Sequence, residues 1–103
     1  MEELFYNLIK NALQAIPENR QGFVEIRLNK VDGKVEVAVQ DNGVGIPEDQ
    51  QQKIFIPNFT TKTTGTGLGL AMVKQIVSNH DGDIWFETKE GEGTTFFVRL
   101  PVK

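Results

Sequence analysis

Residues 24–39 read VEIRLNKVDGKVEVAV, and this stretch predicts a β-hairpin. In the first half Val24, Ile26 and Leu28 alternate with polar residues, and valines repeat this pattern in the second half. Such alternation is typical of strands that bury one face. Asp32-Gly33 stands between the halves and is a strong signal for a two-residue hairpin turn. We therefore expect two antiparallel, half-buried strands.

Two stretches on either side of this hairpin have the apolar spacing of helices, residues 2–16 and residues 67–80. A short third helix is predicted to begin at Pro47, because proline suits the first turn and the acidic residues after it suit the positive end of the helix dipole. It should end before Pro57. The polar, threonine-rich residues 57–66 predict a loop.

The C-terminal part of the chain predicts a second pair of strands. Ile84 and Phe86 belong to the first, residues 96–100 alternate in the second, and Gly91-Glu92-Gly93 forms the turn. The predicted fold class is α+β, a two-layer α/β sandwich whose mixed, largely antiparallel sheet has helices on one face. Residues 1–103 are expected to form one domain, and because the chain opens inside a helix, we expect it to be a piece of a longer protein.

Composition excludes several classes of function. The net charge is −3 and the isoelectric point is near 5.1, which argues against binding nucleic acid, where phosphates require a basic surface. The chain has no cysteine, so a disulfide or a zinc–thiolate site is impossible. No apolar run reaches membrane-spanning length, and the start lacks the pattern of a signal peptide.

Asn7 and Asn11 are four residues apart, which places both side chains on one face of the first helix. A neutral amide oxygen is a plausible ligand for Mg²⁺, which takes its other ligands from water and phosphate. The alternative is that both asparagines only form local hydrogen bonds or face solvent. That alternative weakens because the positions around them are apolar, and a polar pair on a burying helix needs partners.

Asp41 ends the second strand of the hairpin and is followed by Gly43 and Gly45. A carboxylate there can accept a hydrogen bond from the amino group of adenine. Guanine would present a carbonyl oxygen instead, and two facing acceptors cost about 1–3 kcal/mol. Alone, Asp-Asn-Gly would favour a plain turn; together with the other segments, it favours recognition of the base.

Gly65, Gly67 and Gly69 precede the second long helix. Glycines allow the backbone to approach phosphate closely, and free N–H groups at a helix start bind anions. The alternative is a flexible hinge, which is compatible with that role. Lys62 could reach the terminal phosphates as a point charge, although a lysine in a polar loop is more often only solvated. His80 is expected to cap the helix or face solvent, and we do not take it for a phosphorylated residue.

These segments resemble the catalytic and ATP-binding domain of sensor histidine kinases, within the GHKL superfamily. Asn7–Ala15 is similar to the N box, and Asp41–Pro47 to the first glycine box. Ile54–Lys62 resembles the F box, Gly65–Ala71 the second glycine box, and Gly91–Phe96 the final glycine-threonine turn. The five segments are in the family's order and cover nearly the whole chain.

The resemblance implies ATP and Mg²⁺ as cofactors, with a mobile lid over residues 57–66. Asn11 would hold the metal, Asp41 would bind the adenine amino group and Thr94 would stand near adenine, while Asn7, Asn11 and Lys62 would form the catalytic set. The implied nucleotide-binding residues are Asn11, Gln14, Asp41, Gly43, Gly45, Ile46, Phe59, Thr60, Thr61, Lys62, Gly65, Thr66, Gly67, Leu68, Gly69, Leu70 and Thr94.

The F box departs from the family pattern. Ile56 and Asn58 replace an acid and an aromatic residue that many members carry, and Thr60 stands where some members place a phosphate-contacting arginine. Lys62 is therefore the leading candidate for the cation at the phosphates. Asn7 stands where the ATP-hydrolysing branches tend to have a glutamate. An amide is a poor general base, so little ATP hydrolysis is expected.

The main hypothesis is a histidine kinase domain that binds ATP·Mg and donates the γ-phosphoryl group to a histidine on a separate dimerisation domain. A response regulator would be an indirect partner, nucleic acid would not be one, and the isolated domain would be monomeric. The resemblance implies a cytoplasmic domain, with any membrane attachment of the parent protein outside these residues. Two alternatives stay open. One is a self-contained GHKL ATPase or clamp, against which Asn7 counts, and the other is a non-catalytic ATP-sensing module.

Overall fold

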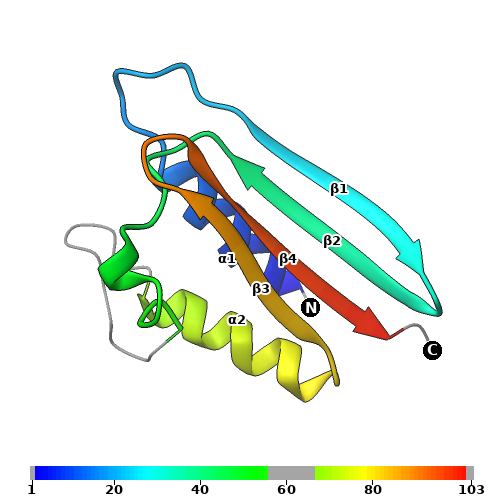
Figure 1. The fold of residues 1–103 in the computed structure, drawn as a ribbon. Coiled ribbons are helices and arrows are strands. Elements are labelled where there is room, and N and C mark those ends of the chain that lie inside the picture. The colour runs from blue at the N-terminus through cyan, green and yellow to red at the C-terminus, as the bar shows by residue number, and fades with distance from the viewer. Residues whose placement is uncertain (1, 56–66, 102–103) are drawn as a thin grey trace.

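The computed structural model describes residues 2–55 and 67–101 (Figure 1). In chain order the elements are helix α1 (Glu2–Gln14), strands β1 (Val24–Val31) and β2 (Lys34–Asp41), the short 3₁₀ helix η1 (Glu48–Gln50), helix α2 (Gly67–Asn79), and strands β3 (Asp83–Lys89) and β4 (Gly93–Pro101). Each predicted helix and strand is therefore confirmed, although α1 ends two residues early. The loop predicted at 57–66 lies outside the described residues. Of the helices that the structure describes, none is long and apolar enough to cross a membrane.

The four strands form one sheet in the order β1-β2-β4-β3, and each of its three pairings is antiparallel. The parallel pairing that a mixed sheet implies is not found among the described strands. Asp32 and Gly33 connect β1 to β2 and both have positive φ, 49° and 76°. This is the backbone of a type I′ turn, whose twist matches that of the flanking strands, so the predicted hairpin is confirmed.

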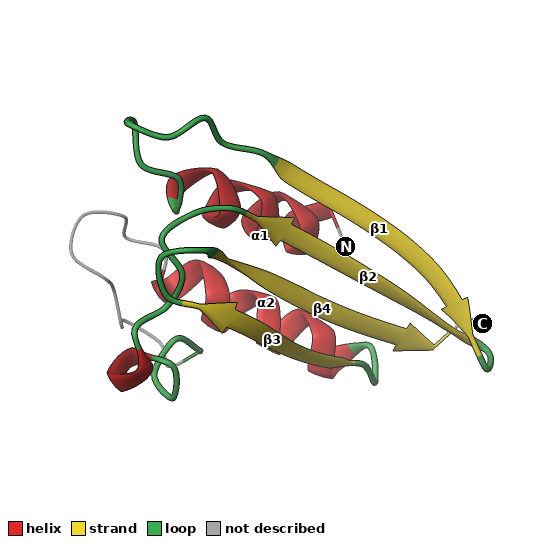
Figure 2. Cartoon of the chain, turned by 45° about the horizontal axis from the view of Figure 1, so that its top comes forward, coloured by secondary structure: helices red, strands yellow, loops and turns green. Residues whose placement is uncertain are grey.

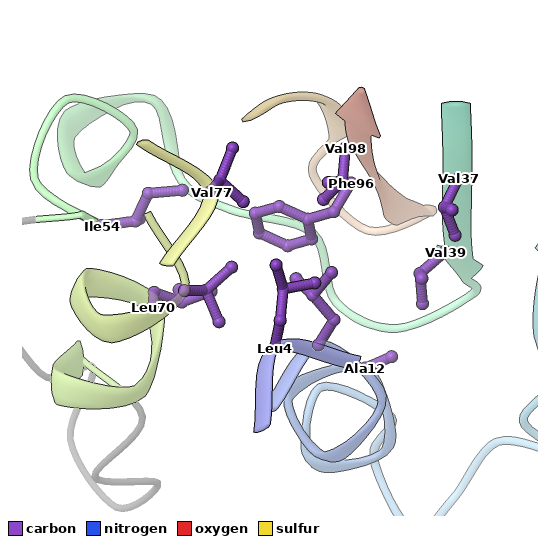
Figure 3. Packing of buried hydrophobic residues seen from close by; sticks show 11 residues of the cluster. Leu4, Ala12, Val37, Val39, Ile54, Leu70, Val77, Phe96 and Val98 are labelled. Carbon is purple, nitrogen blue, oxygen red and sulfur yellow. The ribbon is translucent and has the colours of Figure 1, made fainter. Parts of the chain in front are cut away.

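The hydrophobic core lies between the sheet and the two α-helices, which cover the same face of it (Figures 1 and 2). Every second residue of β2 and β4 points toward the helices, and every third or fourth residue of α1 and α2 points toward the sheet. The packed side chains from these elements meet in Figure 3, together with Ile54 from the segment that follows η1. They are Leu4, Leu8, Ala12, Val37, Val39, Ile54, Leu70, Val73, Val77, Phe96 and Val98.

Strand β1 differs from the prediction of a half-buried strand. Ile26 and Leu28 pair with Val39 and Val37, so they point to the same face as these buried valines. Yet the exposed fractions of Ile26 and Leu28 are 53% and 69%. The reason is that β1 is an edge strand on which α1 packs less than on β2. Of the apolar residues of β1, only Val24 at its start packs against the core. Alternation therefore identified the strand but not its burial.

The C-terminus of α2 is closed by two backbone hydrogen bonds. The N–H of Gly82 donates to the carbonyl of Val77 at 2.9 Å, and the N–H of Asp81 donates to that of Ser78 at 3.1 Å. Asp81 has φ of 60°, so the arrangement is a Schellman motif with aspartate in the left-handed position. Helix α2 therefore ends just before Asp81-Gly82, close to the predicted end at residue 80, and His80 is exposed there.

We predict that Leu8→Ala lowers the free energy of unfolding by about 2–5 kcal/mol, because the side chain of Leu8 is 1% exposed and its loss leaves a cavity between helix and sheet. Leu13→Ala is the matched control, since Leu13 lies on the same helix and is 58% exposed. Urea denaturation of both variants tests this. Equal losses in the two variants would contradict the packing described above.

Candidate functional site

Chain segments that are far apart in sequence meet at one end of the molecule. The C-terminal end of α1, the end of β2, the start of β4 and the N-terminus of α2 all lie on the left of Figure 2, while the turn between β1 and β2 lies at the opposite end. Three of the five segments singled out in the sequence thus meet the described part of a fourth, the second glycine box. This end of the fold is the candidate site.

Asp41 is the buried acidic residue of this site, with 4% of its surface exposed. Its Oδ1 accepts two backbone hydrogen bonds, from the N–H of Gly43 at 2.8 Å and from the N–H of Thr94 at 3.3 Å. Thr94 is its direct partner in the pairing of β2 with β4. In the part of the chain that the structure describes, no donor contacts Oδ2. That oxygen can therefore accept a hydrogen bond from a ligand.

Burial raises the pKa of the Asp41 carboxyl above its ordinary value of 3.8, because a charge loses solvation inside the protein. The hydrogen bonds from Gly43 and Thr94 favour the charged form and act against this rise, but they are the smaller causes. The folded protein therefore bears a cost for keeping this group ionised at neutral pH. A buried carboxylate with that cost is typical of functional sites as well as of structural ion networks.

The glycine segment after Asp41 is held between α1 and the turn that joins β3 to β4. The N–H of Val44 donates to the carbonyl of Ala15 at 3.0 Å, and the carbonyl of Val44 accepts from the N–H of Gly91 at 2.7 Å. Gly45 has φ of 77°, and a Cβ there would lie 2.5 Å from the carbonyl oxygen of Lys89. Glycine is thus required at position 45 both by the backbone conformation and by the close approach of another segment.

Two further residues hold this segment and were not identified from the sequence. Nη1 of Arg20 donates to the carbonyls of Asn42 and Gly43, at 2.7 Å and 2.9 Å. The side chain of Asn42 accepts from the N–H of Phe23 at 2.8 Å and donates to the carbonyl of Gln21 at 3.0 Å. The sequence contains no local signal for these contacts, because the partners are about twenty positions apart and no motif links them.

A third missed residue is Thr88 in β3. Its hydroxyl accepts from the N–H of Ile46 at 2.9 Å and lies 2.8 Å from the hydroxyl of Thr94. Thr88 therefore connects the glycine segment with the strand that carries Thr94. An alternating strand predicts on which face Thr88 lies but not that its hydroxyl has these partners.

The three amide residues predicted to act from α1 are not fully buried. Asn7 and Asn11 are half-buried, whereas Gln14 is exposed at the end of the helix. Leu8 and Ala12, each of which directly follows one of the two asparagines on α1, are buried. The structure thus places Asn7 and Asn11 on one side of a core helix, beside its apolar stripe, as the spacing predicts.

Six predicted site residues, in the lid and the second glycine box, lie outside the described residues: Phe59, Thr60, Thr61, Lys62, Gly65 and Thr66. Helix α2 begins at Gly67, so its first backbone N–H groups, from Gly67 to Leu70, have no acceptor within the helix. The side chain of Leu70 is buried in the core. Any contact of Leu70 with a nucleotide would therefore come from its backbone.

The whole chain, residues 1–103, matches the protein family described as histidine kinase-, DNA gyrase B-, and HSP90-like ATPase. It is 38% identical over 103 residues to sporulation kinase E of Bacillus subtilis (strain 168), and 43% identical over 102 residues to the sensor histidine kinase ZraS of Escherichia coli (strain K12). These alignments cover 100% and 99% of this chain but only 14% and 22% of the two relatives. The chain thus spans less than a quarter of either protein.

Solved structures of histidine kinases are also similar to this chain. The nucleotide-free catalytic domain of the histidine kinase ThkA has a TM-score of 0.82 and 42% identity, covering 96% of this chain and 64% of that one. Full-length ShkA in complex with AMPPNP has a TM-score of 0.83 and 28% identity, covering 96% of this chain and 20% of that one. These similarities confirm the resemblance that the five sequence segments predict.

We predict that Asp41→Asn makes the ligand-free protein more stable at neutral pH. Asparagine is nearly the same size, its carbonyl oxygen can still accept from Gly43 and Thr94, and no charge is desolvated. Because the folded pKa of Asp41 is raised, ionisation costs nothing below pH 3.8, and its cost grows as the pH rises through the folded value. The gain of the variant over the wild type should therefore shrink on acidification.

Urea denaturation at neutral and acidic pH measures this difference. Asp49→Asn is the control, because Asp49 is exposed and its replacement should bring no such gain. A variant that is less stable than the wild type at neutral pH would show that the charge of Asp41 supports the fold rather than opposing it.

Proposed function

This chain belongs to the family of histidine kinase-, DNA gyrase B- and HSP90-like ATPases, as a histidine kinase catalytic domain, and from that premise we propose that it binds ATP·Mg and donates the γ-phosphoryl group to a histidine on a separate domain. The observation that carries the proposal is Asp41, a buried carboxylate at the end of β2 with one oxygen that no described donor contacts. Its place matches the base-recognising acid that the resemblance implies.

Asp41 would select adenine through its charge and its position. Oδ1 is held by the two backbone N–H groups, so the carboxylate cannot rotate freely. Oδ2 would accept a hydrogen bond from the exocyclic amino group of adenine. Guanine has a carbonyl oxygen at that place, which would face the carboxylate as a second acceptor without a proton between them. The site would therefore prefer ATP over GTP.

The phosphates would lie between α1 and the N-terminus of α2. The N–H groups of the first turn of α2, which have no acceptor within the helix, suit an anion, as does the positive end of its dipole. The side-chain oxygen of Asn11 is a hard, neutral ligand and fits Mg²⁺. When bound, the metal would neutralise charge on the phosphates and orient them for transfer.

In the reaction, a nitrogen of the acceptor imidazole would attack the γ-phosphorus. A new N–P bond would form, the bond between the γ-phosphorus and the β–γ bridging oxygen would break, and ADP would leave with the bond electrons. The site supplies position and charge rather than a covalent intermediate. Asn7 cannot accept a proton at neutral pH, so water would not be activated, and transfer to the protein would dominate over hydrolysis.

The partner would be the dimerisation and histidine-phosphotransfer domain of the parent kinase, with a response regulator as the later acceptor. Relatives of this chain are named sensor histidine kinases and are several times longer. Their length supports the proposal that the acceptor histidine lies on another domain. We propose a cytoplasmic location, since ATP is supplied there, and a monomeric state for the isolated domain.

We predict that Asp41→Asn weakens ATP binding by about 1–3 kcal/mol, because a charged acceptor is lost and the amide can turn a donor toward the adenine amino group. Isothermal titration calorimetry with ATP and Mg²⁺ measures the change. Asp49→Asn should bind as the wild type does. Unchanged affinity of Asp41→Asn would show that Asp41 does not recognise the base.

We also predict that Asn11→Ala reduces Mg²⁺-dependent transfer more than it reduces nucleotide affinity, because the amide would act at the metal and not at the base. Transfer is followed with γ-labelled ATP and an added helical domain that carries the acceptor histidine. The 103-residue chain itself should stay unlabelled. Stable label on this chain alone would contradict the assignment.

A further inference from the structure

Arg20 lies in the loop between α1 and β1, and its side chain reaches the backbone that follows Asp41. Its Nη1 donates to the carbonyl oxygen of Asn42 at 2.7 Å and to that of Gly43 at 2.9 Å. Both distances are typical of hydrogen bonds with a charged donor, which are the stronger ones in proteins. One guanidinium nitrogen therefore holds two successive carbonyl groups of the glycine segment.

The carbonyl of Asn42 and the N–H of Gly43 belong to one peptide unit. The described residues contain no cis peptide bond, and in a planar trans unit these two groups point in opposite directions. Arg20 holds the carbonyl on one side, while Oδ1 of Asp41 accepts the N–H on the other side at 2.8 Å. A rotation of this unit would take the N–H away from the carboxylate. The contact of Arg20 with this carbonyl thus opposes that rotation.

Arg20 is itself held by an ordered loop. Its N–H donates to the carbonyl of Pro17 at 3.2 Å. The side chain of Asn42 binds the backbone just after Arg20, at the carbonyl of Gln21 and the N–H of Phe23. The loop and the glycine segment are therefore connected in both directions, each by a side chain that binds the backbone of the other.

We propose that Arg20 is a positioning residue for the buried acid: by holding the carbonyl opposite the Gly43 N–H, it keeps this N–H on Oδ1 of Asp41 and so fixes the direction of Oδ2. The guanidinium also polarises the peptide unit, which strengthens the N–H as a donor and favours the ionised carboxylate. Arg20 would act without touching the nucleotide. Where it concerns binding, the inference rests on the proposed function.

Other charged groups lie near the glycine segment. The turn between β3 and β4 carries Lys89, Glu90 and Glu92, and all three are exposed. Lys89 pairs with Glu92 at 3.1 Å, and water and salt screen the fields of exposed charges. These groups stay the same when Arg20 is replaced, so a change at Asp41 can be assigned to Arg20.

A purely structural role predicts a different result. Arg20 also ties the loop before β1 to the glycine segment, and its loss could loosen this end of the fold as a whole. Such loosening would expose both backbone donors of Asp41, the N–H of Gly43 and that of Thr94, to exchange with solvent. Loss of positioning would free the N–H of Gly43 alone, because the pairing of β2 with β4 holds Thr94 in place.

NMR of the ligand-free 103-residue chain tests the inference through amide hydrogen exchange and titration of the carboxyl carbon. We expect Arg20→Gln to accelerate exchange of the Gly43 amide about tenfold and that of Thr94 less than about twofold. The pKa of Asp41 should rise further, because a donor to its charged form is weakened and a positive charge is lost. Arg27→Gln is the matched control, since it removes an arginine charge from the exposed strand β1.

A second test separates positioning from direct contact of Arg20 with the phosphates. We expect Arg20→Gln to weaken binding of ATP with Mg²⁺, measured by calorimetry, about three- to tenfold. In a chain that already carries Asp41→Asn, it should change the affinity less than about twofold, because residues that act through one another are not additive. A guanidinium that bound the phosphates would weaken ATP binding in both backgrounds. Arg27→Gln should bind as the wild type does.

Equal acceleration of both amides, an unchanged pKa of Asp41, or an equal loss of ATP affinity in both backgrounds would overturn the inference. A folded wild-type chain that does not bind ATP would overturn the proposed function instead, and the NMR measurements would still decide the role of Arg20. If Arg20→Gln does not fold, Arg20→Lys gives the same comparison. Its ammonium keeps the charge but reaches less far, so exchange of the Gly43 amide should rise while that of Thr94 stays unchanged.

Discussion

Asp41 brings a carboxylate into the interior of a small domain, where it must receive hydrogen bonds or cost several kcal/mol. The two described donors are the N–H of Gly43, two residues after Asp41, and the N–H of Thr94, 53 residues after it. The second donor is available only because β2 and β4 pair in the register that sets Asp41 opposite Thr94. A shift of one residue would turn Asp41 to the other face. The register that buries Val37 and Val39 is thus the same register that builds the site.

The segment after Asp41 follows from this constraint. It leaves β2 between the end of α1 and the turn of β3 and β4, with Val44 bonded to both through Ala15 and Gly91. The space between them admits backbone but no side chain at Gly45. The glycines of the first glycine box are therefore needed before any ligand is present. The ionisation of the buried Asp41 carboxyl opposes folding, and under the proposed function this cost in stability would serve binding of the base.

The helices cover the four strands of the sheet unequally. The helices shield β2, β4 and β3, whereas the apolar residues Ile26 and Leu28 of the edge strand are more than half exposed. On the open face, Trp85 and Phe97 stack at 5.4 Å and Arg99 lies over Trp85 while pairing with Glu36 at 2.8 Å. This cluster covers part of the open face, whereas Ile26 and Leu28 lie on the face that the helices cover.

The sequence by itself determined the helices, the strands, the hairpin turn and several segments that meet at the candidate site. Local rules suffice for these features, because periodicity, turn residues and helix ends depend on neighbours along the chain. It also singled out Asp41, Asn11 and Thr94, through motifs of fixed order. Only the tertiary structure decided that β1 is exposed, that Arg20 and Asn42 hold the glycine segment, and that Thr88 bonds to Thr94. Each of these depends on which groups from distant parts of the chain meet at about 3 Å, and a linear pattern of residue types contains no such distance.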